Sequence, residues 1–292
     1  MRAQDYDLAW ALARRQLDAR DPADRDNPAL PYHLRWVWDG RDPTGRRCLV
    51  RCYHGLGDTL QFARFLPLLA RRAASVRVEG QARLLPLLGR VAAAAGVTIQ
   101  LSPFDIDRPL PPSDCDLEIT ELPLALRATP ADAPAPYLPP RRAILPPGTV
   151  GLCHSAGDWD AARSIPAPLL QPLCAQVRCL GLVAAATRLP VLNPAGCPFD
   201  MEATAALVAS CDLVITVDTM VAHLAGAMGR PTWLLLKAEP DWRWPVEGHH
   251  TPWYPTMHLY HQPRAGDWAG VLARVTDNLA AFVSTLARNG AP

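Results

Sequence analysis

The sequence predicts an α/β protein with two domains of similar size, each built around a parallel sheet. Short apolar runs alternate with helix-forming segments in both halves of the 292-residue chain. This alternation is typical of strand–helix–strand units whose helices cover the faces of a parallel sheet. A proline-rich stretch over 130–148 interrupts it near the middle, with the composition of a linker. We therefore expect an N-terminal helix and linker over 1–30, one domain over 31–140 and a second over 141–292.

In the first half, hydrophobic periodicity sets the expected elements. Leucines at helical spacing predict a helix over residues 6–20, and a segment rich in proline and aspartate breaks the pattern after it. The expected strands are residues 46–52, 75–79 and 97–101, and the expected helices are residues 59–72 and 84–95. These elements follow the order of a βαβαβ unit.

In the second half the same alternation restarts. The expected strands are residues 150–154, 178–183, 213–217 and 233–236, and the expected helices are residues 166–176, 201–209 and 221–228. Asp218 and Thr219 stand between the third strand and its helix, with almost no loop. Ligands of open parallel sheets bind at the carboxyl ends of the strands, where a helix N-terminus offers N–H groups to an anion. A phosphorylated ligand is therefore expected at this junction.

Composition and charge exclude several classes of protein. Hydrophobic residues make up 49% of the chain, which predicts a packed core, and the net charge of +1 with scattered basic residues argues against a nucleic-acid surface. None of the eight cysteines belongs to a C-x-x-C pair, which argues against a zinc or iron site. The charged first 20 residues and the short apolar runs predict neither a signal peptide nor an integral membrane segment. We expect a soluble, cytoplasmic protein.

A second strand-to-helix junction, in the first half, carries glycines and a carboxylate. Gly55 and Gly57 allow a tight turn and a close approach of a ligand to the backbone, and Asp58 follows them at a helix start. The carboxylate either takes part in chemistry or only caps the helix, as aspartate commonly does there. Spacing alone leaves both alternatives open.

Five motifs stand in a fixed order along this chain. They are GLGDTLQFARFLPLLA, RSIP, TVDTMVAHLAGAMGRP, PDWRW and TPWYPTMHLYHQ. Together they resemble glycosyltransferase family 9, the heptosyltransferase-like enzymes, and in particular the branch found as the C-terminal domain of bacterial tetratricopeptide-repeat glycosyltransferases. The resemblance runs from about Trp36 to Val275. It implies a GT-B fold, in which two Rossmann-like domains face each other across a cleft.

The resemblance also implies an inverting, metal-independent glycosyltransferase. Its first domain would hold the acceptor, a glycan or protein hydroxyl, and its second a nucleotide-sugar donor such as ADP-heptose. Asp58 matches the family's general base, which takes the proton from the acceptor hydroxyl. The nucleotide sugar is a co-substrate, and no further cofactor is implied. Two Asp-x-Asp strings, at 105–107 and 114–116, lie in expected polar connections, and we expect no metal at either.

The second domain would carry the diphosphate site. By resemblance, Thr219, Met220 and Val221 offer a hydroxyl and backbone N–H groups to the phosphates, and His223 faces the ligand one turn later. The alternative for His223 is packing between helix and sheet. Asp218 is expected to orient the turn, since a carboxylate repels an anion.

Two arginines are expected to complete that site. Arg163 and Ser164 match the family's Arg-Ser pair after the first strand of the second domain, where an arginine neutralises charge on the departing nucleotide. The alternative for Arg163 is a solvated loop position. Arg243 follows the strand 233–236, and the tryptophans on either side of it either stack on a base or sugar or hold the loop in place.

Two departures from the family pattern leave both substrates open. Relatives carry Glu-Gln before Gly-Leu-Gly-Asp, where this chain has Tyr53 and His54. His54, in the acceptor-side loop with Gly55 and Gly57, could shift the acceptor site, modulate the base or do neither. The loop 154–162 also differs from that of relatives, and it borders the expected donor sugar. The alternative functions are a catalytically weak sugar-nucleotide-binding or scaffolding protein and a GT-B-type sugar-nucleotide epimerase.

Overall fold

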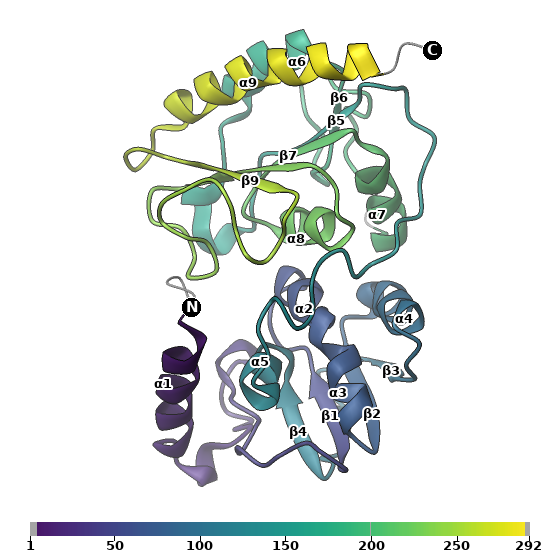
Figure 1. Cartoon of the computed structure of the whole chain (residues 1–292), viewed down its shortest axis with the longest axis vertical. Helices are drawn as coiled ribbons and strands as arrows, with labels where there is room; N and C mark the ends of the chain where they lie inside the picture. Colours follow the sequence, from purple (N-terminus) through teal and green to yellow (C-terminus); the bar gives the residue numbers. More distant parts are fainter. Residues whose placement is uncertain (1–4, 199, 290–292) are drawn as a thin grey trace. The chain divides into compact units, whose positions relative to one another are not determined.

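The computed structural model describes residues 5–198 and 200–289, which form two compact units (Figure 1). The first unit ends at Pro139 and the second begins at Pro140, inside the proline-rich stretch. Each unit contains one sheet whose strands pair in parallel. Two parallel strands must be joined by a crossover connection, which is usually a helix. Such helices cover the faces of each sheet. This requirement explains the alternation of strands and helices along the chain.

The first unit has a four-stranded sheet in the order β3-β2-β1-β4. Its strands are β1 (Arg47–Arg51), β2 (Ser75–Gly80), β3 (Gln100–Pro103) and β4 (Cys115–Glu118). Its α-helices are α1 (Tyr6–Asp18), α2 (Leu56–Phe62), α3 (Leu66–Arg72), α4 (Leu85–Ala94) and α5 (Leu122–Leu126). Because β1 has a neighbouring strand on each side, the residues that follow it lie in the middle of the carboxyl edge of the sheet.

Three expectations for the first unit are wrong in detail. The expected helix 59–72 starts earlier and is two helices, because Pro67 has no N–H to donate and α3 starts afresh after a 3₁₀ turn over Ala63–Phe65. The strand expected at 97–101 begins three residues later, as β3. The segment 114–116 was expected in a polar connection, but its residues Cys115 and Asp116 belong to β4 and pair with β1.

The second unit has a five-stranded sheet in the order β6-β5-β7-β8-β9. Its strands are β5 (Val150–Cys153), β6 (Cys179–Gly181), β7 (Leu213–Val217), β8 (Thr232–Leu236) and β9 (Met257–His261). Its α-helices are α6 (Gln171–Gln176), α7 (Met201–Ser210), α8 (Met220–Ala227) and α9 (Trp268–Asn289). The expected helix 166–176 is a 3₁₀ turn followed by α6. Across the described ranges, no helix is both long and apolar enough to cross a bilayer.

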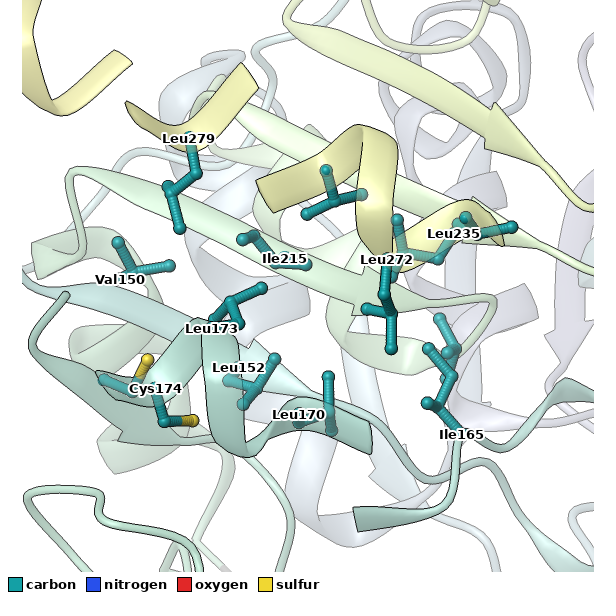
Figure 2. Packing of buried hydrophobic residues seen from close by; sticks show 14 of the residues in the cluster. Val150, Leu152, Ile165, Leu170, Leu173, Cys174, Ile215, Leu235, Leu272 and Leu279 are labelled. Atoms are coloured by element: carbon teal, nitrogen blue, oxygen red, sulfur yellow. The ribbon is translucent and has the colours of Figure 1, made fainter. Parts of the chain in front are cut away.

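The core of the second unit lies between its sheet and the helices α6 and α9 (Figure 2). Ile215 of β7 and Leu235 of β8 are buried there with Leu272 of α9 and Leu173 of α6. Helices α7 and α8 cover the other face of the sheet (Figure 1). Since β5 and β7 are buried on both faces, they are near-continuous apolar runs in the sequence.

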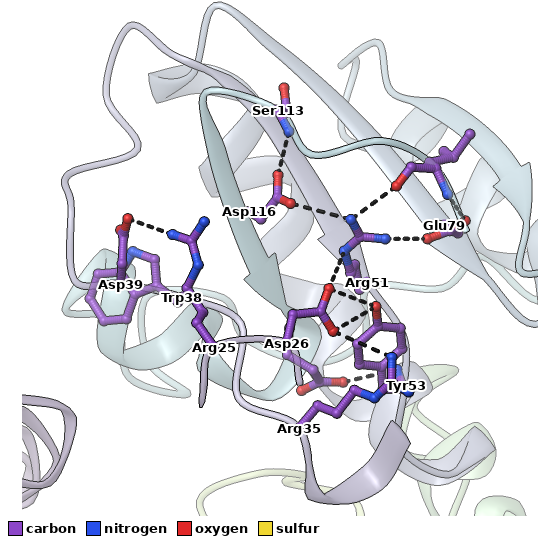
Figure 3. Close-up of polar contacts among 12 residues, drawn as sticks. Arg25, Asp26, Arg35, Trp38, Asp39, Arg51, Tyr53, Glu79, Ser113 and Asp116 are labelled. Atoms are coloured by element: carbon purple, nitrogen blue, oxygen red, sulfur yellow. Dashed lines mark hydrogen bonds and ion pairs between the residues drawn. The ribbon is translucent and has the colours of Figure 1, made fainter. Parts of the chain in front are cut away.

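A buried arginine organises the carboxyl edge of the first sheet (Figure 3). Arg51, the last residue of β1, is 2% exposed. Its Nη1 donates to Glu79 Oε2 over 2.8 Å, and its Nη2 donates to the carbonyl of Leu110 over 3.0 Å and lies 3.3 Å from Asp116 Oδ2. Glu79 Oε1 in turn accepts from the Leu110 N–H over 2.7 Å. Because a buried charge is tolerated only when paired, these bonds fasten the loop before β4 to the sheet.

We predict that the first unit loses stability as the pH rises from about 4.3 to about 7, because of Glu121. Its Oε2 accepts from the backbone N–H groups of Trp38 (3.0 Å) and Glu118 (2.7 Å). Burial nevertheless raises the pKa of Glu121 to about 7, whereas a glutamate in the unfolded chain has a pKa of about 4.3. The unfolded state therefore ionises first, and the free energy of unfolding falls by on the order of 3 kcal/mol across this window.

The measurement is urea denaturation at several pH values between 4.3 and 7.5. In Glu121→Gln the amide oxygen accepts the same two N–H groups but does not ionise, so this decline should shrink. The matched control is Glu247→Gln, at an exposed position in the second unit. If the free energy of unfolding of Glu121→Gln fell with pH as steeply as that of the control, the decline could not be assigned to Glu121.

Candidate functional site

The junction between β7 and α8 is built by a side-chain cap. Thr219 has extended backbone angles, and its Oγ1 accepts from the N–H of Val221 over 3.2 Å, so the helix begins at Met220. The Val221 N–H, expected to bind phosphate, is therefore used by the cap in this structure. The roles of Thr219, Met220 and Val221 towards a ligand stay predictions.

Asp218 stands just before this cap and is 9% exposed. Burial raises the pKa of its carboxyl group, and the neighbouring indole of Trp244 opposes this only in part. Arg163 reaches the same residue from the loop after β5, since its Nη1 donates to the Asp218 carbonyl over 2.8 Å. The structure therefore places Arg163 beside the β7–α8 junction. This position differs from the solvated loop that was its alternative.

Ser164 acts within its own loop. Its Oγ accepts from the N–H of Ala156 over 2.9 Å, and the next residue, Ile165, donates its N–H to the carbonyl of His154 over 2.8 Å. These bonds fold the segment after β5 back on itself. They hold Arg163 and leave the proposed ligand role of Ser164 a prediction.

A pocket of about 220 Å³ opens at the carboxyl edge of the second sheet. Its walls come from the loop after β5, the residue after β7, the end of β8 and the segment that follows β8: Asp160, Arg163, Asp218, Leu235, Leu236, Lys237, Glu239, Pro240 and Asp241. Lys237 Nζ lies 2.8 Å from Asp160 Oδ2, and Arg163 Nε lies 3.7 Å from the same oxygen. Sequence reasoning singled out neither Asp160 nor Glu239. The available signal was Lys237, the one lysine of the chain, directly after an apolar strand.

Arg243 is held by its own loop beside this pocket. Its Nη1 donates to Asp241 Oδ1 over 2.9 Å, and its guanidinium carbon lies 4.9 Å from the centre of the Trp242 ring. Trp242 is 38% exposed, whereas Trp244 is fully buried. The indole of Trp253 also donates to the Arg243 carbonyl over 3.1 Å. Two of these three tryptophans therefore hold the loop, and Trp242 is the one with surface for a ligand.

His223 is packed inside the second unit. It is 4% exposed, its Nδ1 lies 3.0 Å from the Tyr254 hydroxyl, and its ring stacks on Trp244 with centroids 5.6 Å apart. The alternative was packing between helix and sheet; His223 is buried, but these two partners belong to the segment between β8 and β9. A contact with a ligand stays a prediction. Tyr254 reaches His223 because Gly226, on the same helix, has no Cβ: one placed there would lie 2.4 Å from the Tyr254 ring.

In the first unit, the loop after β1 places Asp58 in the third position of α2. Its Oδ2 accepts from the Gly55 N–H over 3.0 Å, so the carboxylate caps its own helix. Gly57 lies inside this first turn. The structure shows Asp58 as a helix cap, and its role as base stays a prediction.

His54 lies next to this turn. Its Nδ1 is 3.0 Å from Oε1 of the buried Glu118, and its carbonyl accepts from Gln81 Nε2 over 2.8 Å. Its imidazole is therefore tied to the end of β4.

Three of the four Asp-x-Asp carboxylates pair with arginines: Asp105 with Arg108, Asp114 with Arg47 and Asp116 with Arg51. Within the described parts of the chain, no group of three metal-ligating side chains is arranged for a metal ion.

We predict that Gly226→Ala destabilises the second unit. The added Cβ would displace the Tyr254 ring and its bond to His223, and overpacking typically costs about 1–3 kcal/mol. The matched control is Gly89→Ala in α4, where the nearest atom would be Leu101 Cδ1 at 3.6 Å. There the change should stabilise by about 0.5–1 kcal/mol. Chemical denaturation measures the free energy of unfolding of both variants. Changes of the same sign in the two variants would contradict the prediction.

The chain is similar in sequence and in structure to known glycosyltransferases. The model of the family "Glycosyltransferase family 9 (heptosyltransferase)" matches residues 184–256, which include β7, α8 and β8. Protein FlbA of Caulobacter vibrioides is 26% identical over 89% of this chain and 52% of its own length. The chain thus spans about half of that curated relative.

Solved structures share the fold. ADP-heptose LPS heptosyltransferase II of E. coli has a TM-score of 0.54 at 16% identity, covering 82% of this chain and 99% of its own. The dodecameric iron-containing heptosyltransferase TibC, solved with ADP-D-β-D-heptose, has a TM-score of 0.56 at 12% identity, covering 86% and 81%; TibC is from enterotoxigenic E. coli. The predicted α/β fold of the GT-B class is confirmed. Residues 184–256 thus match the glycosyltransferase family 9 model, and the chain shares the fold of solved bacterial heptosyltransferases.

Proposed function

We propose that this protein transfers a sugar from a nucleotide-sugar donor, of the ADP-heptose type, to a hydroxyl group of a glycan or protein. The observation that carries the proposal is the pocket at the carboxyl edge of the second sheet, next to the N-terminus of α8 and Arg163. The family match covers this strand–helix–strand unit. TibC, which has the same fold, was solved with ADP-D-β-D-heptose.

In this proposal the second unit binds the donor. Arg163 lines the pocket, and its planar guanidinium suits a phosphate oxygen. The start of α8, with Thr219 and Met220, adds the positive end of a helix dipole. As the sugar leaves, negative charge grows on the nucleotide phosphate, and these groups stabilise it more than they stabilise the bound donor.

Asp58 in the first unit supplies the base. Its carboxylate accepts the proton of the acceptor hydroxyl while that oxygen bonds to the anomeric carbon and the bond from that carbon to the phosphate oxygen breaks. Attack opposite the leaving group inverts the configuration. The cap from the Gly55 N–H fixes the position of the carboxylate on α2. The step needs neither a metal nor a cofactor, since a positioned base and cationic charge supply its chemistry.

We predict that one nucleoside diphosphate stabilises the wild-type protein selectively. Binding to the folded state alone raises the free energy of unfolding by about 2.7 kcal/mol at 100 times the dissociation constant. The measurement is a thermal-shift panel of ADP, UDP, GDP, CDP and the corresponding monophosphates. The rise in melting temperature with the selected nucleoside diphosphate should exceed the rise with inorganic pyrophosphate, which lacks a nucleobase. No shift with any nucleotide would contradict donor binding.

We predict that Asp58→Asn lowers turnover by about 10²- to 10⁴-fold while the protein stays folded. The asparagine oxygen can still accept from the Gly55 N–H, so the cap is kept and only the base is removed. Donor binding and thermal stability should therefore match the wild type. Turnover at the wild-type rate would contradict the role of Asp58.

The same assays separate the other functions. Nucleotide binding without transfer to any acceptor would identify a sugar-nucleotide-binding protein. Conversion of the donor sugar without an acceptor would identify an epimerase.

A further inference from the structure

We propose that Gln81 is a positioning residue of the transfer reaction, which holds the turn that carries Asp58 and acts on the rate through that carboxylate. This inference rests on the proposed function, in which Asp58 is the base. It assigns a role to a residue that follows a neighbouring strand of the sheet, 23 positions further along the chain than Asp58.

Gln81 reaches the turn from the end of β2. Strand β1 lies between β2 and β4, and Arg51, its last residue, pairs with Glu79 of β2 (Figure 1). Gln81 follows two residues later and precedes a 3₁₀ turn over Ala82–Leu84, where its carbonyl accepts from the Leu84 N–H over 2.8 Å. The backbone of Gln81 is therefore held beside the residues that follow β1.

The side-chain amide of Gln81 makes three hydrogen bonds to the turn. Its Nε2 donates to the carbonyls of Cys52 (3.2 Å) and His54 (2.8 Å), and its Oε1 accepts from the Thr59 hydroxyl over 3.0 Å. The two carbonyls accept only from N–H groups of the amide, so the partners fix its orientation. Because Cys52 directly follows β1 and Thr59 lies in α2, these bonds join the start of the turn to the helix.

Thr59 links Gln81 to Asp58. It is fully buried and directly follows Asp58 in the sequence. Its N–H donates to the Gly55 carbonyl over 3.1 Å, while the Gly55 N–H donates to Asp58 Oδ2. Gln81 thus fixes the helical turn on which the carboxylate is capped. A displacement of about 1 Å in a reacting group can cost on the order of 10²-fold in rate, so a residue that sets its position acts on the rate without contacting the substrate.

Glu118 holds the same turn from β4, but only at its start. Its Oε1 accepts from the Tyr53 N–H over 3.2 Å and lies 3.0 Å from His54 Nδ1. The amide of Gln81 bonds this start and also α2. Loss of Gln81 should therefore let α2, with Asp58, move relative to the end of β1, while Glu118 still holds the residues before it.

The test is a double-mutant cycle on the release of ADP from ADP-D-β-D-heptose, with water as the acceptor, in single-turnover reactions. Gln81→Met keeps the length of the side chain and removes its hydrogen bonds. It should lower the rate about tenfold or more and leave the binding of ADP within about twofold, since the proposed donor site is in the second unit. In the Asp58→Asn background the same change should cost less than about twofold, because the group on which it acts is gone. Equal losses in the two backgrounds would overturn the inference.

Further variants separate positioning from a general effect of the substitution. Thr59→Val replaces the hydroxyl that donates to Gln81 by a methyl group and should slow the reaction, whereas Thr59→Ser keeps a hydroxyl and should retain most of the rate. Thr59→Val takes the place of Gln81→Met in the cycle if the latter does not fold. The matched control is Gln100→Met, at an exposed position of β3. A loss of rate as large in this control as in Gln81→Met would overturn the inference.

Hydrogen exchange gives a readout that needs no turnover. Mass spectrometry follows exchange in residues 53–62, which should be about tenfold faster in Gln81→Met than in the wild type and unchanged in Gln100→Met. Unchanged exchange in Gln81→Met would overturn the inference whatever the activity. Release of ADP by Asp58→Asn at the wild-type rate would overturn both the base and this inference. A wild type that releases no ADP would count against the proposed function, and exchange would then decide whether Gln81 holds the turn.

Discussion

The second unit depends on one close contact, the ring of Tyr254 against the bare backbone of Gly226. That contact brings the tyrosine hydroxyl to His223, whose ring stacks on the buried Trp244. Trp244 in turn lies beside the carboxyl group of Asp218, at the wall of the pocket. Helix α8, which consists largely of small residues, and the aromatic side chains of Tyr254 and Trp244 thus pack together beside Asp218. Interiors are packed too densely for a ring to shift without moving its neighbours, so a change at this contact would reach Asp218 at the pocket wall.

The two units use the same property of parallel sheets in different ways. In both, polar residues gather where inner strands end, because the strands themselves are buried on both faces and carry apolar side chains. In the first unit the edge is held by a buried charge network around Arg51 and Glu79. In the second it is held mainly by apolar and aromatic packing, which leaves the charges of Asp160 and Lys237 at a pocket wall.

Local patterns explain which parts of the site were predictable. Asp58 stands out in the sequence because it follows two glycines at an expected strand-to-helix junction, and it lies there in the first turn of α2. The β7–α8 junction stands out because an apolar strand passes into a helix at Asp218 and Thr219 with almost no loop. Asp160 carries no such mark, because a loop aspartate is common. Its pairing with Lys237 depends on the parallel register of β5, β7 and β8, which aligns the segments that follow them.

The sequence by itself determined the class of fold, the alternation of strands and helices and the two junctions. These follow from hydrophobic period and from glycine, proline and capping residues, which act within a few positions of the chain. It did not show that Pro67 would divide a helix, nor that Cys115 and Asp116 belong to a strand. Only the tertiary structure decided that His223 is buried against Tyr254 and that Asp160 meets Lys237. Those contacts join residues distant in sequence, and their partners are chosen by sheet order and packing, which no local pattern encodes.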